Sequence, residues 1–129
     1  MSDYPDDLRY TKEHEWARAD GNRVTVGITR FAVEALGDIT QVDLPKEGES
    51  IAKDAVFGTV ESVKAVSDLF APVTGKVMKV NDPLGDSPEY VNEDCYDEGW
   101  LIVVEMSNPT ELETLMSAAQ YEEYLKDQS

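Results

Sequence analysis

The sequence predicts a mostly β fold, either a sandwich or a barrel, with a short helix in the N-terminal half and helices at the C-terminus. Between residues 38 and 80, short apolar runs are separated by turns that contain proline or glycine, which is typical of antiparallel sheets. This stretch contains none of the long helical connections that a parallel sheet requires. The 129 residues, 41% of them hydrophobic, are enough for one domain with a substantial core.

A hairpin followed by a short helix is expected in the N-terminal half. Residues 15–28 combine the run EWARA, a turn at Asp20-Gly21-Asn22 and the alternating run RVTVGI, which favours two paired strands. Thr29 is suited to cap the following helix at its N-terminus and Gly37 to end it. The face of this helix that we expect to be buried consists of Phe31, Ala32, Ala35 and Leu36.

Short antiparallel strands are expected from residue 38 to residue 80. DITQVDL precedes the loop PKEGES, and the apolar runs AVFGTVES and AVSDLFA follow it. These two runs are close enough to pair as a hairpin over about residues 55–71, with its turn near residues 62–65. The turn APVTG then leads into KVMKV, which alternates as a strand does.

The last third of the chain is expected to contain a loop, a strand and a helical segment. Residues 81–99 are rich in Asn, Asp, Pro and Gly and predict a long surface connection with at most a brief strand at YVN. WLIVVEM predicts one continuous buried strand. Asn108, Pro109 and Glu111 have the spacing of a capping box and begin a helical segment over about residues 108–126, interrupted near Ser117. Its apolar face consists of Leu112, Leu115, Met116, Ala119, Tyr121, Tyr124 and Leu125.

The charge of the chain excludes several classes of partner. The 27 acidic and 11 basic residues give a net charge of −16, and residues 81–129 carry −12 of it. We therefore expect no binding to nucleic acid or to an anionic membrane surface, because both require clustered Lys and Arg. No apolar run approaches the ~20 residues of a membrane span, and MSDYPDDLRY lacks the features of a signal peptide. These observations and the absence of a transit peptide suggest a bacterial cytoplasmic protein, with a processed organellar chain as the alternative. Its acidic third either maintains solubility or steers it toward basic partner surfaces.

Few residues can support catalysis or metal binding. With one cysteine and one histidine, the chain cannot form an internal disulfide, a multi-cysteine zinc site or a site with two histidines. Cys95 lies among the carboxylates of NEDCYDE, which disfavour its thiolate, and His14 in KEHEW is expected to be structural or exposed. The acidic residues of the 81–99 segment do not have the spacing of an EF-hand. We therefore expect no catalytic residues and no metal site.

Lys64 is the residue with the most distinctive position. It lies in GTVESVKAVSDLFAPVTG, at or beside the tip of the expected hairpin. A compact primary amine on a flexible stem is a group that enzymes acylate. An ordinary solvated lysine would occupy the same position, so the hairpin alone leaves both interpretations open.

The segment TVESVKAVSDLFAPVTGKV resembles the lipoyl-lysine hairpin of the glycine cleavage system H-protein family. YTKEHEW, VGITRFAVEALGDITQVDLP, DSPEYVNEDCYDEGWL and the closing PTELETLMSAAQYEEYL resemble that family in the same order, so the resemblance covers essentially the whole chain. Two residues depart from the family's pattern. Arg30 stands where a non-basic residue is usual, and Cys95 stands where proline is usual; these departures leave partner contacts at the helix and the stiffness of the loop open.

This resemblance implies a barrel-sandwich hybrid with added helices, in which residues 1–129 form one lipoyl-carrier domain. It implies that Lys64 carries lipoate through an amide bond and that the protein is a shuttle, not an enzyme. The shuttle would carry an aminomethyl group from the glycine decarboxylase (P protein) to the tetrahydrofolate-dependent aminomethyltransferase (T protein). Dihydrolipoamide dehydrogenase (L protein) would reoxidise the arm, and lipoylating enzymes would attach it. A carrier that visits several enzymes is expected to be a monomer.

The resemblance also implies that the loaded arm docks against the carrier. The arm reaches roughly 14 Å from the backbone, from single-bond lengths near 1.5 Å, and the amine of its cargo requires a carboxylate. Glu13, Glu15 and Asp68 are the candidate contacts, and Ile28 and Leu36 are expected apolar neighbours. Two alternatives remain open: a carrier that relays lipoyl or octanoyl groups to other proteins, and an unmodified binding module that retains the fold.

Overall fold

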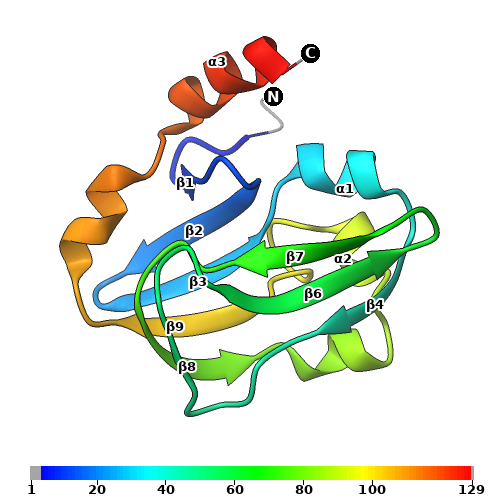
Figure 1. Cartoon of the computed structure of the whole chain (residues 1–129), viewed down its shortest axis with the longest axis horizontal. Coiled ribbons are helices and arrows are strands. Elements are labelled where there is room, and N and C mark those ends of the chain that lie inside the picture. Colours follow the sequence, from blue (N-terminus) through cyan, green and yellow to red (C-terminus); the bar gives the residue numbers. More distant parts are fainter. Residues whose placement is uncertain (1–3, 129) are drawn as a thin grey trace.

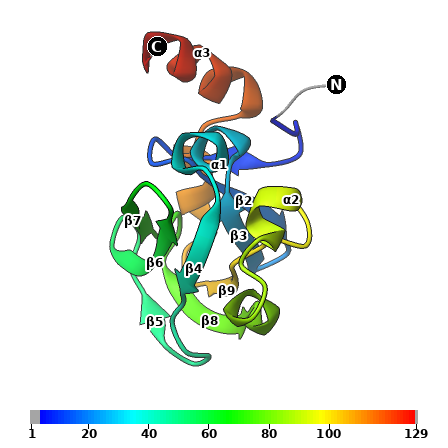
Figure 2. The ribbon, with the colours of Figure 1, turned by 90° about the vertical axis from the view of Figure 1, so that its right-hand side faces the viewer.

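Two antiparallel sheets form the protein, as the computed structural model of residues 4–128 shows (Figures 1 and 2). The larger sheet has the strand order β1-β2-β3-β9-β8-β5, and the smaller sheet has the order β4-β6-β7. Buried side chains from both sheets share one hydrophobic core, among them Val26 and Val104 from the larger sheet and Val60 and Leu69 from the smaller. The predicted mostly β fold with peripheral helices is confirmed.

The strands are short, as the turn spacing predicted. The larger sheet consists of β1 (Arg9–Tyr10), β2 (Glu15–Asp20), β3 (Arg23–Ile28), β5 (Ser50–Ile51), β8 (Gly75–Val80) and β9 (Ile102–Met106). The smaller sheet consists of β4 (Ile39–Asp43), β6 (Val56–Ser62) and β7 (Val66–Phe70). Both expected hairpins form, because β2 pairs with β3 and β6 pairs with β7.

Helix α1 (Arg30–Leu36) has the expected caps, and Ala32 and Leu36 pack against the core as predicted. The Thr29 side chain accepts a hydrogen bond from the Ala32 amide, and Gly37, at a φ of 80°, donates to the Val33 carbonyl. The prediction that Ala35 is buried was wrong: Val33 packs into the core and Ala35 is exposed. The Phe31 ring packs against His14 at a centroid distance of 4.5 Å.

Residues 81–99 form a long connection, as predicted, but without the brief strand expected at YVN. They contain a 3₁₀ turn, η1 (Asp82–Gly85), and a short helix, α2 (Tyr90–Glu93), and bury Leu84, Val91 and Cys95. The Trp16 indole donates to the Cys95 carbonyl at 2.9 Å. Isolated apolar side chains within a polar segment have no regular period, so the sequence pattern could not reveal this burial.

Strand β9 alternates, which corrects the prediction of a continuous buried run. Ile102, Val104 and Met106 are buried, whereas Glu105 is exposed. β9 lies between β3 and β8, and side chains of a strand point alternately to its two faces. Only the side chains on the core face are therefore enclosed.

The C-terminal segment is helical in two parts. A 3₁₀ segment, η2 (Pro109–Thr114), and α3 (Ala118–Gln128) are separated by an extended stretch in which Met116 pairs with Tyr10. Asn108 caps η2 by accepting from the Thr110 amide. The expected capping box is absent because the carboxylate of Glu111 instead accepts from the amide and hydroxyl of Thr74.

Helix α3 covers β1 beside the N-terminal segment (Figure 1). Its buried residues are Ala118 and Tyr121, whereas Ala119, which the sequence placed on the apolar face, is exposed. The rings of Tyr10 and Tyr121 stack at 4.8 Å, and burial raises the pKa of both phenols. No helix among residues 4–128 is long and apolar enough to cross a membrane.

Close packing at Gly27 provides a test of this fold. A Cβ added to Gly27 would lie 2.5 Å from the ring of Trp16, its register partner on β2. We expect Gly27→Ala to lower the free energy of unfolding by about 1–3 kcal/mol, because the buried indole must shift. Gly85→Ala is the matched control, since a Cβ there meets nothing within 4 Å. Denaturant unfolding of both variants measures this difference. Equal midpoints for the two variants would contradict the close packing at Gly27.

Candidate functional site

The turn that carries Lys64 is short and held by local hydrogen bonds. Glu61 and Val66 are the last paired residues of β6 and β7, so residues 62–65 form the turn. The Ser62 hydroxyl oxygen accepts from the amides of Lys64 and Ala65, each at 3.1 Å. The Ser62 amide donates to the Ala65 carbonyl at 2.8 Å. These bonds fix the backbone of a turn whose tip is exposed to solvent.

A second set of contacts attaches this turn to the end of α1. The Val63 amide donates to the Asp38 carbonyl at 3.1 Å. The aliphatic stem of Lys64 lies over Gly37, where an added Cβ would be 3.5 Å from Cε of the lysine. Figure 1 shows the tip of the hairpin beside the segment that joins α1 to β4. The position of Lys64 therefore also depends on residues outside its own hairpin.

The Lys64 amine is exposed and takes part in no ion pair among residues 4–128. Other lysines do form ion pairs: Lys53 with Asp54 and Lys126 with Glu123. Two neighbours in the turn, Val63 and Val66, are 68% and 63% exposed. The amine is thus available for modification, beside apolar surface that a modifying enzyme can contact.

Asp68 lies on the outward face of β7. Side chains of a strand alternate in direction, and Leu69 is buried while Val66 and Asp68 are exposed. Asp68 lies two residues beyond Val66, the first residue of β7, so ~7 Å of strand separates it from the end of the turn. Phe70 lies on the same outward face, at the end of β7 farthest from the turn.

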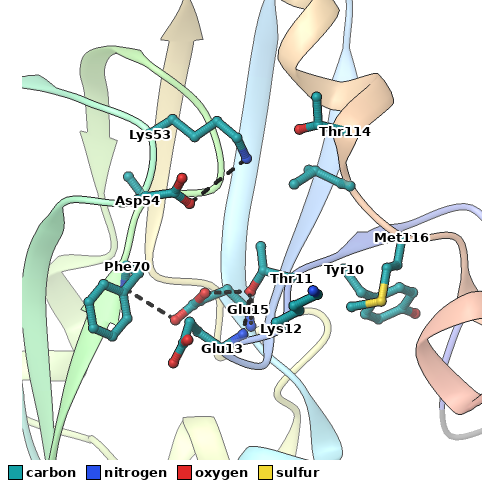
Figure 3. Close-up of a pocket in the computed structure, with 12 residues that line it drawn as sticks. Tyr10, Thr11, Lys12, Glu13, Glu15, Lys53, Asp54, Phe70, Thr114 and Met116 are labelled. Atoms are coloured by element: carbon teal, nitrogen blue, oxygen red, sulfur yellow. Dashed lines mark hydrogen bonds and ion pairs between the residues drawn. The ribbon is translucent and has the colours of Figure 1, made fainter. Parts of the chain in front are cut away.

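A cavity of about 260 Å³ lies at this far end of the hairpin (Figure 3). It brings together residues from β1, β2, β7 and the loops beside them, including Thr11, Glu13, Glu15, Lys53, Asp54 and Phe70. The structure therefore places Glu13 and Glu15 at one cavity, Asp68 along the strand that leads to it, and Lys64 at the opposite end of that strand.

Glu15 is a carboxyl in the core, only 1% exposed. The Thr11 hydroxyl donates to its Oε1 at 2.6 Å, and the Phe70 amide donates to its Oε2 at 3.1 Å (Figure 3). Burial raises the pKa of Glu15 to about 8, although both hydrogen bonds act in the opposite direction. At neutral pH this carboxyl is mostly protonated, and a cation placed beside it would favour its ionised form.

The two apolar candidate residues, Ile28 and Leu36, pack in or against the hydrophobic core. Ile28 is buried opposite Glu15 in the β2–β3 register, and Leu36 is half-buried against the core. Contact between a docked arm and Ile28, Leu36, Glu13, Glu15 or Asp68 stays a prediction.

His14, Arg30 and Cys95 each hold parts of the structure together. His14 Nδ1 hydrogen-bonds the Tyr121 hydroxyl at 2.7 Å. Burial lowers the pKa of the His14 imidazole. The Arg30 guanidinium donates to the Asn92 carbonyl at 3.3 Å, and Cys95 is fully buried. Residues 4–128 hold no cluster of three or more His, Cys, Asp or Glu that could bind a metal ion.

Sequence reasoning missed the residues that support this site. Thr11 orients Glu15, and the backbone of Phe70 supplies the second donor. Asn92 donates to the Gly37 carbonyl beneath Lys64. Gly37 itself was recognisable as the end of α1, but its contact with Lys64 joins segments far apart in the sequence, and no local pattern marks it.

Comparison with known proteins gives consistent matches over nearly the whole chain. The family described as "Glycine cleavage H-protein" matches residues 8–128. A glycine cleavage system H protein of Anaeromyxobacter sp. (strain K) is 56% identical over 124 residues, covering 96% of this chain and 97% of that protein. One from Halalkalibacterium halodurans is 51% identical over 128 residues, covering 99% and 100%.

A solved structure matches the fold as well. The crystal structure of a glycine cleavage system H protein from Mycobacterium marinum superposes with a TM-score of 0.84 at 40% identity, covering 96% of this chain and 98% of that one. By these matches the chain belongs to the glycine cleavage H-protein family, which is a family of lipoyl carriers and not of catalysts.

Proposed function

We propose that this chain is the lipoyl-bearing shuttle of the glycine cleavage system, with lipoate attached to Lys64 by an amide bond. The observation that carries the proposal is an exposed amine, free of ion pairs among residues 4–128, on a turn fixed by Ser62 and Asp38. Membership of the H-protein family supports the same assignment. Residues 1–129 would act as one lipoyl-carrier domain.

The surroundings of Lys64 suit an acylated lysine. Forming the amide removes the charge of the amine, and no internal ion pair among the described residues is broken by that loss. The exposed Val63 and Val66 offer apolar surface to the hydrocarbon chain of the arm. When bound, lipoate supplies a disulfide that accepts the aminomethyl group and is reduced in doing so.

The proposed partners are the glycine decarboxylase, the aminomethyltransferase, dihydrolipoamide dehydrogenase and the lipoylating enzymes. Residues 81–129 carry −12 of the net charge of −16, and such a surface accelerates association with basic faces on partners. Transient visits to several enzymes suit a monomer. The bacterial relatives support a cytoplasmic location.

For the loaded arm we propose two carboxyl contacts along one path. Asp68 lies ~7 Å of strand beyond the turn that carries Lys64, within the roughly 14 Å reach of the arm, and it is exposed. Glu15 and Glu13 lie farther along, at the cavity beyond Phe70. Asp68 would hold the cationic amine first, and Glu15 would ionise where an amine enters the cavity.

The attachment site is tested by intact mass after co-expression with a lipoylating enzyme. The parent chain should gain one lipoyl increment, and Lys64→Ala should gain none. Lys76→Ala, which removes an exposed lysine of β8, should be modified like the parent. A lipoyl increment that persists in Lys64→Ala contradicts the assignment. Glycine-dependent methylenation of tetrahydrofolate by the modified chain with its partner enzymes then separates the shuttle from a lipoyl relay.

Glu15 gives the free protein a defined pH dependence. Its carboxyl ionises near pH 4.5 when unfolded and near 8 when buried, so folding takes up a proton between these values. The free energy of unfolding therefore falls as the pH rises through this window, by up to roughly 1.4 kcal/mol per pH unit. Glu15→Gln should remove this slope in denaturant unfolding, and the exposed Glu13→Gln should keep it. If the free energy of unfolding of Glu15→Gln and of the parent chain changed with pH in the same way, Glu15 would not be a buried neutral acid.

Asp68→Asn tests the first contact of the loaded arm. Losing one partly screened charge pair is expected to accelerate hydrolytic release of the aminomethyl group about two- to fivefold. The release of ammonia from the isolated loaded carrier measures this rate. Asp20→Asn, at the end of β2, removes an exposed carboxylate elsewhere and should leave the rate unchanged. Equal rates in both variants would show that Asp68 does not hold the amine.

A further inference from the structure

Asn92, in α2, bridges the backbone on both sides of Asp38. Its Nδ2 donates to the Gly37 carbonyl at 2.8 Å, and its Oδ1 accepts from the Ile39 amide at 2.8 Å. The junction between a helix and a strand leaves backbone groups that neither element satisfies. One side chain with both a donor and an acceptor therefore fixes the three-residue segment 37–39.

That segment is the external support of the lysine turn. The Asp38 carbonyl accepts from the Val63 amide at 3.1 Å, and Gly37 lies against the stem of Lys64. A shift of residues 37–39 would move both the anchor and the surface on which the lysine lies. The hydrogen bonds of Ser62 fix the shape of the turn but do not connect it to the rest of the molecule.

Asn92 also has a fixed position relative to α1. Its own carbonyl accepts from the Arg30 guanidinium at the first residue of that helix. The nearby Tyr96 hydroxyl accepts from the Arg30 amide at 2.9 Å. The segment from residue 90 to residue 96 thus contacts both ends of α1, so the Asn92 side chain is attached to elements outside the hairpin.

We propose that Asn92 is a positioning residue for Lys64: through Gly37, Asp38 and Ile39 it fixes where the lysine turn is presented to the enzymes that act on it. It touches neither the lysine nor the modifying group. The consequence for modification rests on the proposed function, whereas the consequence for the order of the turn does not.

Two measurements on Asn92→Ala test this role. Exchange of the Val63 amide with solvent, followed by NMR, should accelerate on the order of tenfold, because its acceptor loses support. Steady-state kinetics of lipoyl transfer to the unmodified carrier should show a higher KM with little change in kcat, since a smaller fraction of the carrier presents a competent turn. Asn92→Asp, which keeps the acceptor but loses the donor to Gly37, should fall between the parent and Asn92→Ala.

Asn81→Ala is the matched control for loss of stability. Its Nδ2 also donates to two backbone carbonyls of the same connection, those of Glu98 and Trp100, but neither leads to the hairpin. Asn108→Ala, which removes the exposed cap of η2, serves as a second control that should fold normally. Neither should change Val63 exchange or the KM.

The outcomes are separable. Faster Val63 exchange and a higher KM in Asn92→Ala, absent from the controls, support the role of Asn92. Values in Asn92→Ala within twofold of the folded controls overturn it. If the parent chain accepts no lipoyl group, the proposed function fails, and Val63 exchange alone then supports or overturns the positioning role.

Discussion

The hydrogen bond from the Val63 amide to the Asp38 carbonyl connects the lysine turn to the rest of the protein. A lysine that must project into solvent cannot be held by contacts of its own amine, so its position depends on the backbone beneath it. Ser62 stiffens the turn from within, and the end of α1 supports it from outside. The exposed tip can therefore be chemically accessible and still have a defined place.

The carboxyl groups near the hairpin differ in their exposure to solvent. Acidic groups such as Asp68 lie exposed on the surface, in contact with solvent. Glu15 alone among the acidic residues of the described chain is buried, and burial raises its pKa to about 8. The buried carboxyl of Glu15 thus offers a charge that forms only when a cation offsets its burial.

The C-terminal helix links these two regions. The Tyr121 hydroxyl of α3 hydrogen-bonds His14 at 2.7 Å and the Thr29 hydroxyl at 2.8 Å. His14 belongs to the loop that carries Glu13 and Glu15, and Thr29 caps the helix whose other end supports the lysine turn. Helix α1 therefore connects the cavity to the turn. Asn92 of α2 and Tyr96, which follows α2, brace the same helix.

The sequence by itself determined the longer strands, the caps of α1 and the turn that presents Lys64, because alternation and turn residues act over a few neighbouring positions. Only the tertiary structure decided that Val33 is buried instead of Ala35, that residues 81–99 fold as short helices, and that Glu111 binds Thr74. It also decided the surroundings of Glu15 and the bridge made by Asn92. Some of these features join residues that lie between 37 and 79 positions apart in the sequence, and others depend on which face of an element meets the core. Burial and hydrogen-bond partners of this kind exist only after distant segments have packed together.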